Sequence, residues 1–326
     1  MATTHTPPQA KQDRRVIIDT DPGIDDAAAI LMALGSPELR VETLTTVFGN
    51  APVAQSTLNA LRILEAADRT DIPVYEGVGK PFNSTEPAFA AHVHGTDGFG
   101  DVSWPLPTTL SQRRNAVVEL IDRVLATPGE LTVLALGRLT NLALAISVEP
   151  QVATALQAII VMGGAVTVPG NASPVASANI WGDPEAAEVV YRSGAKIVQI
   201  GLDVCNQVEI SSAQQEHVWD VKSKAARLLQ TITPCLQRSY ERRGLLHHAG
   251  GVRYNDVPAV AYVVDPSLFS CRDLHVRIET SGRYTRGQTV ADLHGQSGIP
   301  PNVSVALDVD AIRLTHLWVE RVRHLR

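Results

Sequence analysis

The segment Arg15-Val-Ile-Ile-Asp-Thr-Asp-Pro-Gly-Ile-Asp-Asp-Ala27 joins a short apolar run to a turn rich in carboxylates. The apolar run from Arg15 to Asp19 is typical of a buried strand. The Pro22-Gly23 pair marks a turn. Strong helix formers then run from Ala27 to Leu34 and stop at Gly35, so a helix is predicted there. The segment therefore predicts a strand, a tight turn and a helix.

The same alternation continues along the chain. Strands are predicted at 41–47, 74–75, 131–136, 158–162 and 196–200, with helices at 51–67, 111–126, 139–147 and 184–193. A helix over 211–241 broken at Pro234, strands near 273–279 and 302–308 and a helix near 310–323 complete the predictions. Alternating strands and helices indicate a parallel sheet.

We therefore predict one α/β domain over residues 15–326. Its Rossmann-like, mostly parallel central sheet would be flanked by helices, with the active site at the carboxyl edge of the strands. Residues 1–14 are polar, contain two prolines and have no apolar core, so we expect a disordered tail rather than a secretion signal.

The composition excludes several classes of protein. The 326 residues are 44% hydrophobic and 19% charged, which is too apolar for a disordered chain. The net charge of −6 provides no basic field for nucleic acid, and no apolar stretch is long enough to span a membrane. Three distant cysteines encode neither a disulfide framework nor a zinc knuckle. We expect a reduced, cytoplasmic protein.

Four carboxylates crowd the turn after the first strand: Asp19, Asp21, Asp25 and Asp26. Because they would repel one another, a cation is the natural compensation, and oxygen ligands without Cys or His favour Ca²⁺ or Mg²⁺. A helix cap with solvated turn residues is the plainer alternative. Phosphatases of the haloacid dehalogenase type also carry Asp-x-Asp after their first strand, but here Pro-Gly and a double Asp follow.

The run from Asp19 to Ala27 resembles the signature of the inosine–uridine-type nucleoside hydrolases, and the resemblance covers nearly all of residues 15–323. Further matching motifs follow in order along the chain: Thr46-Val-Phe-Gly-Asn50, Leu136-Gly-Arg-Leu-Thr-Asn141, Val161-Met-Gly-Gly164, Gly170-Asn171, Asn179-Ile180, Asp183-Pro-Glu-Ala-Ala187, Asn255-Asp256 and Thr285-Arg-Gly-Gln-Thr-Val-Ala-Asp292.

The resemblance implies a calcium-dependent hydrolase of the N-ribosidic bond, with roles for individual residues. Ca²⁺ would be held by the side chains of Asp21, Asp26 and Asp256 and by the backbone carbonyl of Thr140. Asp21 would also take a proton from the attacking water. The ribose would be bound by Asp25, Asn50, Met162, Asn171 and Asn179.

This chain departs from the family pattern at positions that would contact substrate. Asn255 stands where many relatives have a histidine that protonates the leaving base, and an amide cannot supply a proton. Ser177 replaces a glutamate that holds the ribose 5′-hydroxyl. His94 matches a loop histidine that pyrimidine-preferring relatives place near the base, so it is our candidate proton donor.

The sequence therefore predicts release of ribose and free base from ribonucleosides, a reaction of purine or pyrimidine salvage. Ser177 suggests an alternative, action on a 5′-modified ribosyl compound. Asn255 suggests another, a ribose-binding protein with weak or no turnover. The expected partners are a small-molecule nucleoside and further copies of the chain in a homodimer or homotetramer, with neither nucleic acid nor membrane.

Overall fold

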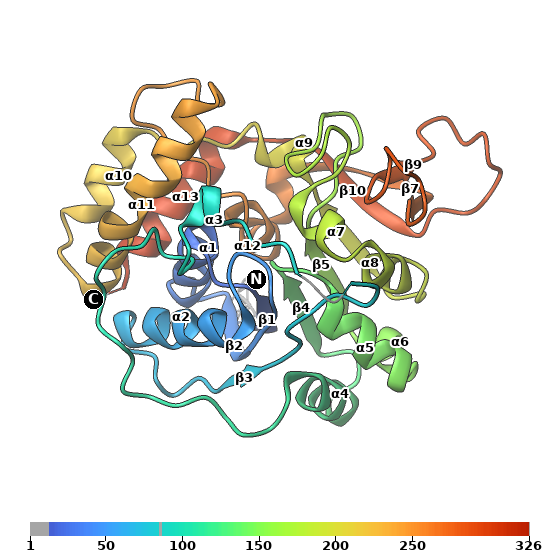
Figure 1. Ribbon diagram of the computed structural model, residues 1–326, viewed down its shortest axis with the longest axis horizontal. Coiled ribbons are helices and arrows are strands. Elements are labelled where there is room, and N and C mark those ends of the chain that lie inside the picture. Colours follow the sequence, from blue (N-terminus) through green and yellow to red (C-terminus); the bar gives the residue numbers. More distant parts are fainter. Residues whose placement is uncertain (1–12, 85–86, 326) are drawn as a thin grey trace, which may run out of the picture.

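The computed structural model describes residues 13–84 and 87–325. Its centre is an eight-stranded sheet of order β3-β2-β1-β4-β5-β6-β10-β7 (Figure 1). The strands are β1 (Arg14–Thr20), β2 (Leu39–Thr46), β3 (Val74–Glu76), β4 (Leu131–Ala135), β5 (Ala158–Met162), β6 (Ile197–Ile200), β7 (Phe269–Leu274) and β10 (Val303–Val309). All neighbours are parallel except β7, which runs antiparallel to β10. The predicted α/β fold with a mostly parallel sheet is confirmed.

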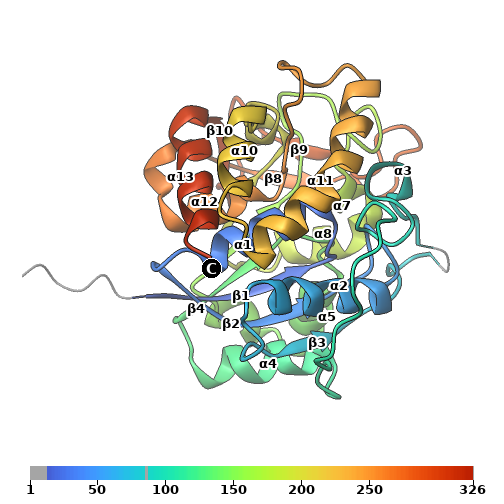
Figure 2. The same ribbon diagram turned by 90° about the vertical axis from the view of Figure 1, so that its left-hand side faces the viewer.

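Helices cover both faces of the sheet (Figure 2). One layer contains α1 (Ile24–Leu34), α2 (Val53–Ala66), α10 (Ser212–Trp219), α11 (Lys224–Arg242), α12 (Val257–Val264) and α13 (Ala311–Arg323). The other contains α4 (Ala116–Ala126), α5 (Thr140–Val148), α6 (Gln151–Ala155) and α8 (Pro184–Tyr191). In β1, Val16 and Ile18 join the core on the first side, and Ile17 joins the core on the second. A strand covered on both faces is apolar throughout, which explains the run after Arg15.

The order of the sheet reverses at β1, which lies between β2 and β4. In sheets of this kind ligands bind at such a reversal, beyond the carboxyl ends of the strands. Short elements surround this edge: α3 (Ala91–His94), α7 (Ala178–Gly182) and α9 (Leu202–Cys205). A 3₁₀ turn (Pro266–Leu268) and a small hairpin of β8 (Val276–Ile278) and β9 (Thr289–Ala291) complete the fold.

Several predicted elements are corrected. The helix expected at 211–241 is two helices, α10 and α11, and the break falls near Lys222, whose φ is 57°. Pro234 lies inside α11, because buried residues such as Ile232 and Leu236 hold the helix against the core. The predicted tail, residues 1–14, falls almost wholly outside the described residues, although Arg14 begins β1. Among the described helices, none has the length and apolar character needed to cross a bilayer.

Candidate active site

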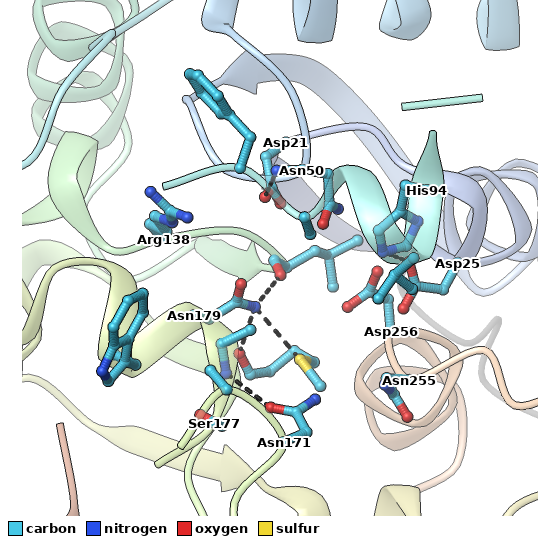
Figure 3. A pocket seen from close by; sticks show the side chains of 18 of the residues that line it. Asp21, Asp25, Asn50, His94, Arg138, Asn171, Ser177, Asn179, Asn255 and Asp256 are labelled. Carbon is cyan, nitrogen blue, oxygen red and sulfur yellow. Dashed lines mark hydrogen bonds and ion pairs between the residues drawn. The ribbon is translucent and has the colours of Figure 1, made fainter. Parts of the chain in front are cut away.

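A cavity of about 320 Å³ opens beyond the carboxyl ends of β1, β2, β4 and β5 (Figure 3). The turns after β1, β2 and β4 contribute Asp21, Asn50, Leu136 and Arg138, while Asp25 comes from the start of α1 and Met162 from the end of β5. The other walls come from the segments 88–94 and 171–181, from the end of α11 and from Asn255-Asp256 before α12. The cavity therefore lies at the reversal of the sheet, where the sequence predicts the active site.

Three carboxylates form a compact group beside this cavity. Asp25, Asp26 and Asp256 each offer an oxygen, and these oxygens lie within 4.8 Å of one another. Asp25 and Asp26 lie in the first turn of α1, and Asp256 is the residue before α12. Because α1 and α12 pack together, carboxylates 230 positions apart in the chain meet at two helix N-termini, where negative charge is favoured.

Asp21 lies in the same cavity but outside that compact group. Its Oδ2 accepts a hydrogen bond of 2.7 Å from the backbone N–H of Asn50. A Cβ on Gly49 would lie 1.8 Å from this oxygen, so only glycine allows the approach. Asn50 in turn donates through Nδ2 to Asp26 Oδ2 at 3.0 Å. The turn after β2 thus fixes two of the four acids.

Burial raises the pKa of every acid in this group. Desolvation raises the pKa of Asp25 to about 6, and desolvation with repulsion from Asp25 raises that of Asp26. Desolvation and neighbouring carboxylates raise the pKa values of Asp21 and Asp256 well above the usual range. Asp25 Oδ1 is buried and has no hydrogen-bond partner in the part of the chain that the structure describes. Crowded, desolvated carboxylates with an unpartnered oxygen fit a divalent cation.

Neutral side chains form the wall next to the acids. Asn179 Nδ2 donates to the carbonyls of Leu136 at 2.5 Å and Met162 at 3.0 Å. Asn171 Oδ1 accepts from the backbone N–H of Ala178. Each amide is oriented by one end, so its other end can meet a sugar hydroxyl in the cavity. Ser177 is buried, and its Oγ accepts from the N–H of Gly164 at 2.7 Å.

The opposite wall is rich in hydrogen-bond donors. His94 Nδ1 accepts from the N–H of Ile24 at 3.2 Å, and burial lowers the pKa of His94 to about 4. The neutral ring therefore carries its proton on Nε2, 3.8 Å from Asp25 Oδ1. The phenolic oxygen of Tyr240 accepts from Asn255 Nδ2, which leaves its O–H free to donate. Arg243, 5.0 Å over the Tyr240 ring, is a donor only.

Thr140, a predicted metal ligand, belongs to the helix that follows the turn after β4. Its hydroxyl donates to Asp183 Oδ2 at 2.7 Å, and Thr140 begins helix α5 without lining the cavity. The backbone that lines the cavity is earlier, at Leu136, because the turn between β4 and α5 points into it. The carbonyl ligand at Thr140 therefore stays a prediction, and Leu136 is the residue of this segment that lines the cavity.

Among the polar residues that line the cavity, the sequence alone did not single out Arg138 and Tyr240. Arg138 lies within the motif that runs from Leu136 to Asn141, and Tyr240 lies in the last turn of α11. Neither carries a pattern that marks it as functional. Their position becomes visible only when the end of α11 and the turn after β4 meet across the cavity.

A mostly parallel sheet with an acidic cluster at its reversal and a cavity wall of side-chain amides fits an N-ribosyl hydrolase. The comparisons with known proteins agree: the chain belongs to the family of inosine-uridine preferring nucleoside hydrolases, whose model matches residues 16–316. It is therefore a hydrolase acting on ribonucleosides. This relationship removes the haloacid dehalogenase alternative.

Relatives match over nearly their whole length. The chain is 40% identical to probable uridine nucleosidase 2 of Arabidopsis thaliana, over 95% of this chain and 97% of that one. It is 35% identical to the pyrimidine-specific ribonucleoside hydrolase RihA of Salmonella typhi, over 95% and 98%. Among solved structures, the plant nucleoside hydrolase PpNRh1 matches with a TM-score of 0.89 and 38% identity over 95% and 99%. A purine-preferring ribonucleoside hydrolase from Gardnerella vaginalis matches with a TM-score of 0.90 and 32% identity, over 95% of this chain and 98% of that one.

Proposed function

We propose that this nucleoside hydrolase is calcium-dependent and prefers ribonucleosides whose base carries oxo groups, such as uridine. The donor wall of His94, Tyr240 and Arg243 carries this proposal. Uracil presents carbonyl acceptors to such a wall, whereas cytosine places an amino donor at one of these positions. A site whose buried donors are left unpaired discriminates strongly against the wrong ligand. The names of the Arabidopsis and Salmonella relatives support a pyrimidine substrate.

The cation would be held by Asp21, Asp26 and Asp256. Hard carboxylate oxygens, with neither sulfur nor imidazole among them, suit Ca²⁺. The buried, unpartnered oxygen of Asp25 supports a positive charge nearby. When bound, Ca²⁺ would lower the pKa of a water molecule and polarise ribose hydroxyls.

Residues of one cavity wall would then act on the sugar and the attacking water, and residues of the opposite wall would act on the departing base. Asp21 accepts a proton from the attacking water, whose oxygen forms a bond to C1′. The C1′–N bond breaks, and its electron pair stays on the base, which is why donors on that side matter. His94 and Tyr240 donate hydrogen bonds to the departing base and stabilise its developing negative charge. Asn50, Asn171 and Asn179, with Asp25 and Met162, hold the sugar while positive charge develops on it.

The experiment is a measurement of base release from uridine, inosine, cytidine and adenosine. It is run with protein stripped by chelator and then with Ca²⁺ or Mg²⁺ restored. We expect turnover of uridine and inosine to exceed that of cytidine and adenosine, and to return with Ca²⁺. Equal turnover of uridine and cytidine would contradict the role of the donor wall. Full turnover without a divalent ion would contradict the metal.

We further propose a homodimer or homotetramer in the cytoplasm, as the family resemblance suggests. All three cysteines, Cys205, Cys235 and Cys271, are unpaired, which suits a reducing compartment. Light scattering on the purified protein measures the oligomer directly. A monomer at micromolar concentration would contradict the first part of this proposal.

A further inference from the structure

Arg138 is a buried arginine with an unused pair of hydrogen-bond donors at the cavity wall. Its side chain is 6% exposed and lines the cavity. Nη2 donates to the carbonyls of Ala88 and Gly49, and the guanidinium lies 4.5 Å over the ring of Phe48. Nη1 is buried and has no hydrogen-bond partner among residues 13–84 and 87–325.

This arrangement is unusual for a buried charge. Such charges are normally paired, because burial without a partner costs several kcal/mol. Within the described parts of the chain, no carboxylate lies within ion-pair distance of Arg138. Asp21 and Asp183 act on it only at longer range, and desolvation lowers the pKa of Arg138. The N–H groups of Nη1 therefore lack an acceptor at a residue that lines the cavity, and a ligand that enters the cavity and shifts this side chain slightly can supply one.

The position of Arg138 indicates which part of the ligand brings it. Figure 3 shows Arg138 on the side of the cavity away from His94 and Asn255, with Asn179 between. The base is directed toward His94 in the proposed function, so Arg138 lies at the sugar end. It also packs against α7, where a Cβ on Gly182 would lie 2.2 Å from Arg138 Nε.

The chemistry of the sugar narrows the choice further. The 2′ and 3′ hydroxyls are the groups that the acids and amides are proposed to hold, so the 5′ carbon is the position free to carry an extension. Helix α7 and its N-cap, from Ser177 to Gly182, contain no acidic residue that would repel an anion. A phosphate offers several acceptor oxygens and matches the planar guanidinium better than any neutral group.

We propose that Arg138 binds a phosphate on the ribose 5′ carbon, so that ribonucleoside 5′-monophosphates are substrates; this rests on the proposed function. The reaction is the same hydrolysis: water adds its oxygen to C1′, the C1′–N bond breaks, and the base leaves with a proton. The products are ribose 5-phosphate and the free base, and the phosphate ester is untouched.

The first test compares ribose with ribose 5-phosphate by isothermal titration calorimetry. The wild-type protein should bind ribose 5-phosphate about tenfold to a hundredfold more tightly, the size of a charge-assisted hydrogen bond. Arg138→Met should remove this difference while ribose binding stays within about threefold. The matched control is Arg321→Met, which removes a largely buried arginine of α13 that does not line the cavity. This variant should retain the tighter binding of ribose 5-phosphate. Equal binding of the two sugars by the wild type would overturn the proposal, even if Arg138→Met fails to fold.

The second test measures base release from uridine and uridine 5′-monophosphate. The monophosphate should have the higher kcat/KM, and Arg138→Met should reverse the ratio. Arg138→Lys keeps the positive charge but loses the paired donors of the planar guanidinium, so it should retain part of the preference for the monophosphate. Hydrolysis of uridine with no advantage for the monophosphate overturns the phosphate site and leaves the proposed function standing. Tight binding of ribose 5-phosphate without base release from either compound would contradict the proposed function and leave the phosphate site standing.

Discussion

The side-chain amide of Asn255 donates a hydrogen bond of 2.8 Å to the phenolic oxygen of Tyr240. Both residues are buried in the cavity wall, and Asn255 directly precedes Asp256 in the acidic group. An amide cannot protonate a leaving base, but it can occupy the acceptor side of a phenol. The pair thus leaves the Tyr240 hydroxyl as a hydrogen-bond donor at the cavity wall.

Tyr240→Phe tests this relationship. Removing the hydroxyl should lower kcat/KM for uridine about 10-fold to 100-fold, because the departing base loses a hydrogen-bond donor. Hydrolysis of nitrophenyl riboside should change less, since its leaving group needs little assistance. The matched control is Tyr254→Phe, which removes a buried hydroxyl bonded to Thr233 outside the cavity wall. Equal losses in the two variants would assign Tyr240 a structural role only.

His94→Ala separates proton donation from binding. We expect a larger loss with uridine than with nitrophenyl riboside if His94 assists the departing base. Because burial lowers the pKa of His94 to about 4, its ring stays neutral from pH 6 to pH 8. His94 should therefore cause no fall in the wild-type rate across this range. A fall that disappears in His94→Ala would show that the histidine acts in its protonated form.

Asp26→Ala should abolish calcium binding and lower kcat/KM by several orders of magnitude. The fold should survive, because the variant also relieves repulsion between buried carboxylates. Calorimetric titration with Ca²⁺ measures the loss, and circular dichroism monitors the fold. Asp122→Ala removes an exposed acid of α4 and should change neither quantity. A variant at Asp26 that stays fully active in excess chelator would contradict this prediction.

Ser177→Glu should shift preference toward unmodified nucleosides. A carboxylate at this position can grip a 5′-hydroxyl through a charge-assisted bond, worth about 1.5–3 kcal/mol, and it repels an anionic substituent. The measurement is the ratio of kcat/KM for a 5′-substituted and a plain riboside. Ser177→Ala, which removes the acceptor for the Gly164 N–H without adding charge, is the companion variant. An unchanged ratio in Ser177→Glu would mean that position 177 does not face the 5′ group.

Much of the fold was predictable from sequence because its signals are local. The apolar run before Asp19 and the helix formers after Asp26 indicate strand and helix without knowledge of the remaining chain. The Asp183-Pro184 start of α8 is equally local, with Asp183 accepting from the N–H of Ala186. The break near Lys222 was missed because Pro234 is the stronger local signal, and tertiary packing overrides it.

The site was only partly predictable, because several of its residues are brought together by contacts between distant parts of the chain. Carboxylates and amides that follow strands indicate a site from the sequence alone, and the structure brings Asp25, Asp26 and Asp256 together as one group. Thr140 does not line the cavity, and its motif does not say which backbone carbonyl faces the site. Arg138 and Tyr240 depend on partners 50 and 15 positions away, Ala88 and Asn255, which no local pattern relates.

The distance in sequence between Asp26 and Asp256 has a consequence for biosynthesis. A growing chain completes the acidic turn of α1 first, and Asp256 before α12 is added 230 positions after Asp26. Strand β10 is later still, and β7 reaches the sheet only through it. Early fragments therefore carry crowded acids without their last partner. The three-carboxylate group can therefore assemble only after the segment around Asp256 has left the ribosome, so a cation that needs all three acids would bind late in synthesis.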